Sequence, residues 1–128
     1  MMRGAVLLAT SLGLLEPTHA QEITLACSGT YTSYQPPEPE SSISGLSILL
    51  NLRTGKVRTL LGDMTVTKDR SDEVVSSQPL VEEGRVTGKT ITSINRITGQ
   101  TSILRVRDAN QNPVFHYQLT CRPARRMF

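Results

Sequence analysis

The sequence lacks tryptophan altogether and has few other aromatic residues, only two histidines and only two cysteines among its 128 residues. Aromatic residues make up 4% of the chain, which leaves little material for a carbohydrate-stacking platform or a base-stacking surface. Charged residues make up 20% and hydrophobic residues 38%, which is the composition of an ordinary globular protein. The length allows one domain.

The start of the chain has the pattern of a secretory signal peptide. A short positively charged segment (residues 1–3) precedes an apolar stretch (residues 4–15), and small residues precede a cleavage point after Ala20. The apolar stretch is shorter than the roughly 20 residues that cross a bilayer. We therefore expect a signal peptide over residues 1–20, a single β domain over residues 21–128, and a periplasmic or secreted protein with no integral membrane segment after processing.

The two cysteines, Cys27 and Cys121, lie near opposite ends of the expected mature chain. Outside the cytosol an even pair of cysteines indicates a disulfide. Free thiols or a metal site are the alternatives. A metal site needs more ligands than two thiolates, and the expected mature chain has one histidine, His116. We expect a disulfide, with no metal and no cofactor.

Strand patterns dominate the rest of the sequence. Apolar and polar residues alternate along residues 22–31 and 114–122, and both cysteines fall on the apolar face of their strand. Further strands are predicted at residues 46–52, 57–61, 64–67, 74–75, 90–96 and 101–107. Residues 41–53 also fit a short helix. The pattern predicts an all-β antiparallel barrel or sandwich of about eight strands, with the disulfide joining the first and last strands.

Turns and one loop separate these strands. A short Thr-Gly pattern recurs around Gly55, Gly88 and Gly99, and its spacing suits successive hairpin turns in which glycine supplies a positive φ. Residues 32–42 contain three prolines and two glutamates and predict a polar, extended loop that could serve in recognition. The candidate binding residues in this loop are Pro36, Pro37 and Glu38.

Basic residues provide a second candidate surface. Arg122, Arg125 and Arg126 crowd the end of the chain and could bind an anionic partner. Arg105 and Arg107 share one strand face and are expected on the outside of the fold. The net charge of +3 is mild and no basic motif accompanies it, so we expect no nucleic-acid partner.

Catalytic motifs are not evident in the chain. His116 falls on the polar face of its strand, where we expect a solvent-exposed histidine. No G-x-S-x-G nucleophile motif is present among the many serines. We therefore expect no catalytic residues and a protein that is not an enzyme.

Three short segments carry a resemblance to known proteins: Leu25-Ala26-Cys27-Ser28-Gly29, Ile94-Asn95-Arg96-Ile97-Thr98-Gly99 and Tyr117-Gln118-Leu119-Thr120-Cys121-Arg122-Pro123. With them the chain resembles small secreted proteins of rhizobium-like α-proteobacteria, a group with no assigned activity. Through its export signal and one disulfide on a small β fold, the chain also resembles, more weakly, periplasmic lysozyme inhibitors of the small-barrel type. It departs from their Ser-Gly-x-x-Tyr pattern, because Tyr31 comes one place too early after Ser28-Gly29.

These observations favour a non-catalytic binding or structural protein of the bacterial cell envelope, with an unidentified protein or envelope component as its partner. An inhibitor of an envelope-directed enzyme such as a lysozyme is the alternative, and a small hydrolase is a more distant one. Binding is expected through loops at one end of the fold.

Overall fold

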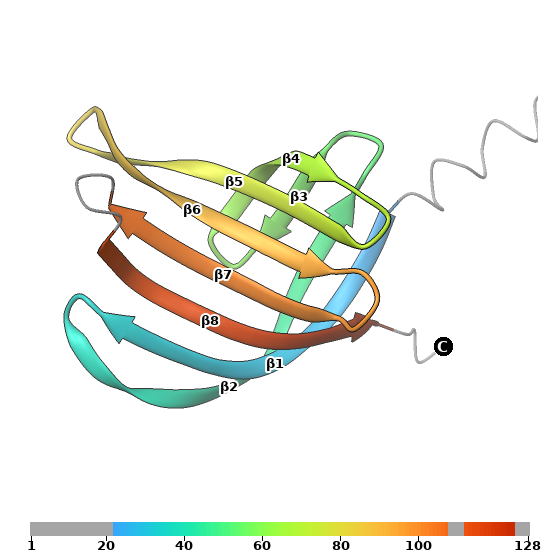
Figure 1. Cartoon of the computed structure of the whole chain (residues 1–128), viewed down its shortest axis with the longest axis horizontal. Helices are drawn as coiled ribbons and strands as arrows, with labels where there is room; N and C mark the ends of the chain where they lie inside the picture. Colours follow the sequence, from blue (N-terminus) through green and yellow to red (C-terminus); the bar gives the residue numbers. More distant parts are fainter. Residues whose placement is uncertain (1–21, 108–111, 125–128) are drawn as a thin grey trace, which may run out of the picture.

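The computed structural model describes residues 22–107 and 112–124, which form one closed antiparallel β-barrel (Figure 1). Its strands are β1 (Glu22–Tyr34), β2 (Pro37–Asn51), β3 (Lys56–Thr59), β4 (Gly62–Asp69), β5 (Glu73–Glu82), β6 (Arg85–Asn95), β7 (Gln100–Arg107) and β8 (Asn112–Pro123). Each strand pairs with its neighbour in sequence, and β8 closes the barrel against β1. The predicted all-β fold of about eight strands is confirmed, and it is a barrel, not a sandwich.

The alternation of apolar and polar residues accounts for the two terminal strands. In β1 the side chains of Leu25 and Cys27 are buried while those of Thr24 and Ala26 are exposed, as a strand with one face on a core requires. Ile48 and Leu50 continue the same alternation in β2, so residues 41–51 form a strand and the helical alternative is wrong.

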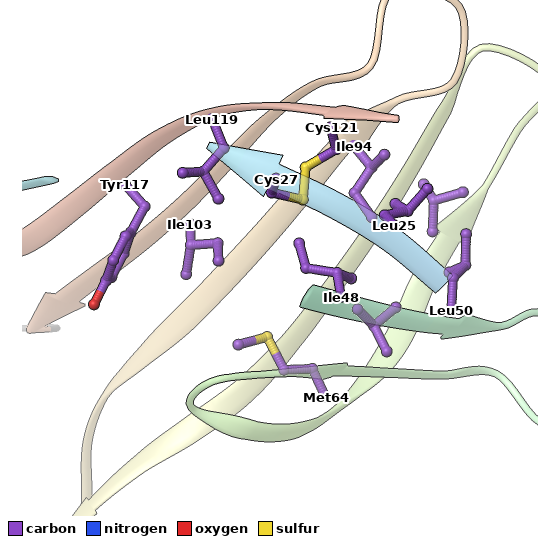
Figure 2. Packing of buried hydrophobic residues seen from close by; sticks show 12 residues of the cluster. Leu25, Cys27, Ile48, Leu50, Met64, Ile94, Ile103, Tyr117, Leu119 and Cys121 are labelled. Atoms are coloured by element: carbon purple, nitrogen blue, oxygen red, sulfur yellow. A yellow bond between two sulfur atoms is a disulfide. The ribbon is translucent and has the colours of Figure 1, made fainter. Parts of the chain in front are cut away.

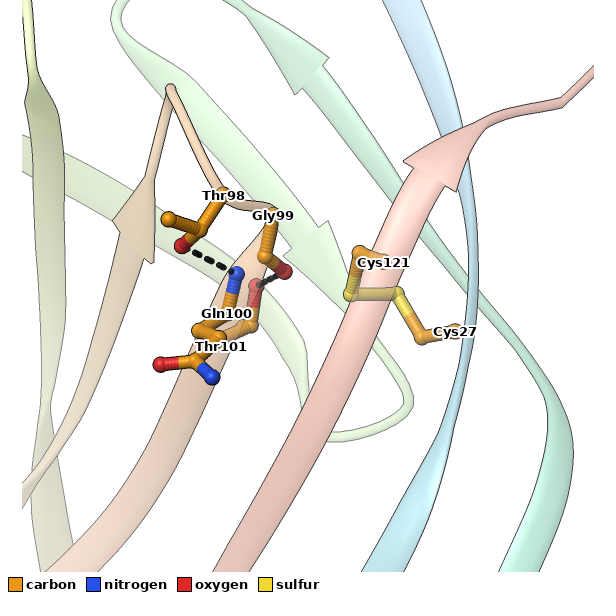
Figure 3. The surroundings of a disulfide bond; sticks show 6 residues. All are labelled: Cys27, Thr98, Gly99, Gln100, Thr101 and Cys121. Atoms are coloured by element: carbon orange, nitrogen blue, oxygen red, sulfur yellow. Dashed lines mark hydrogen bonds between the residues drawn. A yellow bond between two sulfur atoms is a disulfide. The ribbon is translucent and has the colours of Figure 1, made fainter.

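The predicted disulfide is present at the seam between the first and last strands (Figure 3). Cys27 and Cys121 lie directly opposite each other in the β1–β8 pairing, with their Cα atoms 4.1 Å apart. Both are buried, with 4% and 6% of their surface exposed. The bridge joins residues 94 positions apart and thereby ties together the two ends of the described chain.

The apolar core lies inside the barrel, close to the disulfide (Figure 2). Its buried members come from all eight strands and are Leu25, Cys27, Ile48, Leu50, Val57, Met64, Val74, Ile94, Ile103, Tyr117, Leu119 and Cys121. Burial of each large aliphatic side chain contributes about 1.5–3 kcal/mol. Two buried hydroxyls in this region, those of Ser76 and Thr92, are directed at the Met64 sulfur.

The segment predicted as a polar loop, residues 32–42, is instead the tip of a long hairpin. β1 runs to Tyr34, Gln35 and Pro36 form a two-residue turn, and β2 begins at Pro37. The turn is held by the Ser33 hydroxyl, which donates to the Pro36 carbonyl at 2.6 Å. Most side chains here are exposed on both faces of the hairpin, so the sequence has no alternation from which a strand could be predicted.

The Thr-Gly pattern marks a turn at two of its three positions. Gly55 and Gly99 lie in hairpin turns with φ near 71° and 80°, as expected. Gly88 lies inside β6, and the β5–β6 turn is formed by Glu83 and Gly84. A Cβ atom at position 88 would lie 2.0 Å from the Val106 carbonyl oxygen, so the close approach of β7 explains this glycine.

The two ends of the barrel differ because β3 and β4 pair with only part of β2 and β5. The end with the β1–β2 and β5–β6 turns (residues 35–36 and 83–84) is called the open end, and the opposite end, with Cys27 and Cys121, the disulfide end. Of β2, only residues 49–51 pair with β3, and of β5, only residues 74–77 pair with β4. The remaining strands therefore extend past β3 and β4 toward the open end, on the left of Figure 1.

Candidate functional site

Side chains that face the barrel interior form rows, because paired residues on neighbouring strands lie side by side. The row that follows the Cys27–Cys121 pair toward the open end is mainly apolar and consists of Val74, Ile94, Thr101, Leu119 and Gly29. The next row mixes hydroxyls with apolar groups and consists of Ser76, Thr92, Ile103, Tyr117 and Tyr31. The third row, toward the open end, consists of Gln78, Thr90, Arg105, Phe115 and Ser33. The interior thus becomes more polar and finally cationic toward the open end.

The third row marks the level at which β3 and β4 stop covering the interior. The Gln78 amide donates to the carbonyl of Leu61, in the β3–β4 turn, at 3.2 Å. Ile103 in the second row is fully buried, whereas Arg105 and Phe115 in the third are only partly buried. The third row is therefore accessible from the open end.

Arg105 faces the interior and not, as the sequence predicted, the outside of the barrel. Its Nε donates to the hydroxyl of the fully buried Thr90 at 2.8 Å, and its Cζ lies 4.9 Å from the centre of the Phe115 ring. A cation over an aromatic face is attracted by the ring quadrupole. The two contacts fix the guanidinium in the third row.

Three of the five aromatic residues in the chain form a cluster, and one of them, Phe115, lies against this arginine. The ring centre of Tyr31 lies 4.7 Å from that of Tyr117 and 6.0 Å from that of Phe115. The Phe115 and Tyr117 rings meet edge to face at 5.6 Å. Burial raises the pKa of Tyr117, the neighbouring Tyr31 raises it further, and the positive charge of Arg105 lowers it. The cluster thus combines apolar ring faces, two phenol groups and one cation.

An ion-pair network joins the hairpins at the open end. The Arg107 guanidinium lies 2.8 Å from the Glu82 carboxylate and donates to the Gln35 side-chain carbonyl at 2.6 Å. Hydrogen bonds from Arg107 and Thr87 lower the pKa of Glu82. Arg107 is thus paired with an acid and connects β7 to the β5–β6 hairpin and the β1–β2 turn.

The candidate binding residues from the sequence lie at two opposite ends of the barrel. Pro36, Pro37 and Glu38 are exposed at the β1–β2 tip, at the open end. Arg122 is exposed beside Cys121, at the disulfide end. Arg125 and Arg126 lie outside the described residues, as does the expected signal peptide. The two candidate surfaces therefore do not form one site.

His116 is half-buried and hydrogen-bonded, not solvent-exposed as the sequence predicted. It lies on the outer face of β8, and its Nε2 is 2.8 Å from the Ser102 hydroxyl of β7. Burial lowers its pKa, which favours the neutral ring. The pair borders a polar groove of about 540 Å³ that runs over the outer faces of β5 to β8.

The outer groove contains a serine, a histidine and a carboxylate, but they are not arranged as the triad of a hydrolase. Its carboxylate, Glu73, accepts a hydrogen bond from Ser93 at 2.9 Å, at the β5–β6 side of the groove, away from the Ser102–His116 pair of β7 and β8. A triad needs the carboxylate on the histidine. Among residues 22–107 and 112–124, no three potential metal ligands of the histidine, cysteine or acidic type gather at one place.

The Arg105 cluster escaped prediction because β7 carries apolar residues on both faces. Ile103 shares its face with Arg105, while Leu104 and Val106 lie on the alternate positions. The signal that could have identified the inward face lies in β8, where Tyr117 and Cys121 fix the core side and pair in register with β7 and β1.

The part of the chain described by the structure contains no helix long and apolar enough to cross a membrane. No protein-family model matches the chain, and no curated protein or solved structure is significantly similar to it.

Proposed function

We propose that the chain is an exported, non-catalytic binding protein of the bacterial cell envelope, and that its ligand docks at the open end of the barrel. The observation that carries this proposal is the third interior row, in which Arg105 and Phe115 face the accessible part of the interior. Small-ligand sites usually combine apolar and aromatic side chains with a few fixed polar groups, as this row does.

The disulfide supports the exported location. Disulfides persist mainly in oxidising compartments such as the periplasm and the extracellular space. The predicted signal peptide is tested by the intact mass of protein recovered from the periplasm. We expect the measured mass to equal that of a chain that begins at Gln21. A mass that includes residues 1–20 would overturn the proposal of export.

The binding role is tested by mapping where molecules touch the barrel. We expect a chemically mixed fragment library, followed by amide and side-chain NMR, to produce shifts at Tyr31, Arg105 and Phe115. Phe115→Leu should weaken the binding, because it removes one ring of the cluster. His116→Gln is the matched control, since residue 116 is the next along β8 and faces outward.

Two results would contradict the proposed role. Binding that is lost in His116→Gln and kept in Phe115→Leu would move the site to the outer groove. Turnover of peptidoglycan, peptide or ester substrates that Ser102→Ala abolishes would show that the protein is an enzyme.

The inhibitor role remains the second candidate, because the β1–β2 hairpin presents Pro36, Pro37 and Glu38 exposed at its tip. Inhibition of a lysozyme by the purified protein, lost when Glu38 and the two prolines are replaced by alanine, would favour that role.

A further inference from the structure

We infer that the open end takes a small organic acid, with its carboxylate on the Arg105 guanidinium and its apolar body against the aromatic cluster. This inference rests on the binding role proposed above and adds the chemical class of the ligand. It follows from the charge, the orientation and the surroundings of one side chain.

Arg105 forms no ion pair with an acidic side chain of the described residues, although its charge helps to lower the pKa of Glu82, which is paired with Arg107. Four other arginines do have such a partner within ion-pair distance, and these are Arg58, Arg70, Arg96 and Arg107. Those four pairs lie on exposed or rim positions, whereas Arg105 faces the barrel interior beside the fully buried Thr90. A partly desolvated cation attracts an anion more strongly than a fully solvated one does.

The guanidinium is held in one orientation before any ligand arrives. Thr90 accepts the Nε hydrogen, and the guanidinium carbon lies 4.9 Å from the centre of the Phe115 ring. Neither Nη1 nor Nη2 donates a hydrogen bond to another of the described residues. Two parallel N–H groups of this kind match the two oxygens of a carboxylate.

The aromatic cluster suits the body of such an acid. The Phe115 ring lies against the guanidinium, the rings of Tyr31 and Tyr117 extend the cluster from it, and Ile103 lies one row deeper. Ring faces favour flat or compact apolar groups.

The number of charges favours a monocarboxylate over a phosphate. The other arginine of β7 near the open end, Arg107, already pairs with Glu82 at 2.8 Å, and Arg85 beside the 83–84 turn is exposed to solvent. The charge that faces the interior without an ion-pair partner is therefore the single positive charge of Arg105, which a carboxylate balances. A phosphate dianion would place a surplus negative charge near the Glu82 carboxylate.

The test uses phenylacetate as probe and phenylacetamide, which has the same shape without the charge, as its matched comparison. By calorimetry or NMR titration we expect phenylacetate to bind about 10-fold or more tightly than phenylacetamide, and inorganic phosphate to bind more weakly than phenylacetate. Arg105→Gln should weaken phenylacetate about 10-fold or more and make the acid and the amide nearly equal. Arg85→Gln, which removes the same charge at an exposed position beside the 83–84 turn, is the matched control and should leave the preference for the acid unchanged.

Each other outcome has a defined meaning. Equal binding of the acid and the amide by the unaltered protein, tighter binding of phosphate, or an unchanged preference in Arg105→Gln would overturn the inference. If Arg105→Gln does not fold, the inference is tested with Arg105→Lys, which keeps the charge but lacks the paired N–H groups and should bind phenylacetate more weakly. The comparison of phenylacetate with phenylacetamide on the unaltered protein is the second test. If neutral compounds bind as tightly as acids and Phe115→Leu weakens their binding, the carboxylate inference is wrong and the binding role is supported. If no compound binds at the open end, both proposals are wrong.

Discussion

Removal of the Cys27–Cys121 bridge should lower stability mainly through the unfolded chain. The β1–β8 seam also contains a continuous register from Leu25–Pro123 to Ser33–Phe115, so the folded barrel remains closed without the bridge. For a bridge that spans 94 positions, the loop-closure model gives about 4–5 kcal/mol. The total unfolding free energy of a domain of this kind is about 5–15 kcal/mol, so the loss is a large fraction of it.

The assay is urea unfolding of the mature protein, followed by circular dichroism, for the double variant Cys27→Ala, Cys121→Ala. At a slope of about 2 kcal/mol per molar urea, the midpoint should fall by about 2 M, and the slope itself should rise because the unfolded chain becomes more expanded. Ser28→Ala with Thr120→Ala is the matched control, since these residues form the adjacent pair at the same seam. A loss under about 1 kcal/mol, or a large loss with an unchanged slope, would refute the reasoning.

Three further predictions concern the core, the strand spacing and the one described histidine. Ile103→Ala should destabilise the barrel by about 2–5 kcal/mol in urea unfolding because Ile103 is fully buried, with the outward-facing Leu104→Ala as a milder control. Gly88→Ala should lower the free energy of unfolding by about 1–3 kcal/mol or more, because its Cβ would lie 2.0 Å from the Val106 carbonyl oxygen. Lys89→Ala, on the exposed face, is the control and should change the free energy of unfolding little. Equal losses in the two variants would contradict the close packing of β6 and β7. Burial lowers the pKa of His116, so the folded protein binds that proton less readily than the unfolded chain; its contribution to stability is full above about pH 6.5 and is lost as the pH falls through the folded pKa. Unfolding free energies measured between pH 7 and pH 5 should show this dependence weakened in His116→Gln.

The sequence predicts the strands well wherever one face is buried and the other exposed. β1 and β8 alternate over most of their length, and the position of both cysteines on the apolar face anticipates the bridge. The hairpin tip around Gln35 and Pro36 lacks this contrast because both of its faces meet solvent. Apolar and polar residues alternate where one face of a strand is buried, so the parts of a strand that extend beyond the core show little alternation.

The candidate site could not be predicted for a related reason. The direction of Arg105 depends on pairing between β7, β6 and β8, in which Thr90, Arg105 and Phe115 align. A sequence gives the residues of one face of a strand but not which face is turned inward when both carry apolar groups. That choice is made by contacts between strands far apart in the chain.

The incomplete pairing of β2 and β5 has a consequence for self-association. Strand edges that lack a neighbour can recruit a second copy of the chain into a continuous sheet, which leads to aggregation. Pro37 and Pro39 on β2 and Pro79 on β5 have no N–H to offer such a neighbour, and Glu38 and Glu40 would bring like charges together. The prolines and glutamates of the β1–β2 hairpin, which also obscure this strand in the sequence, thus disfavour edge-to-edge association at the open end.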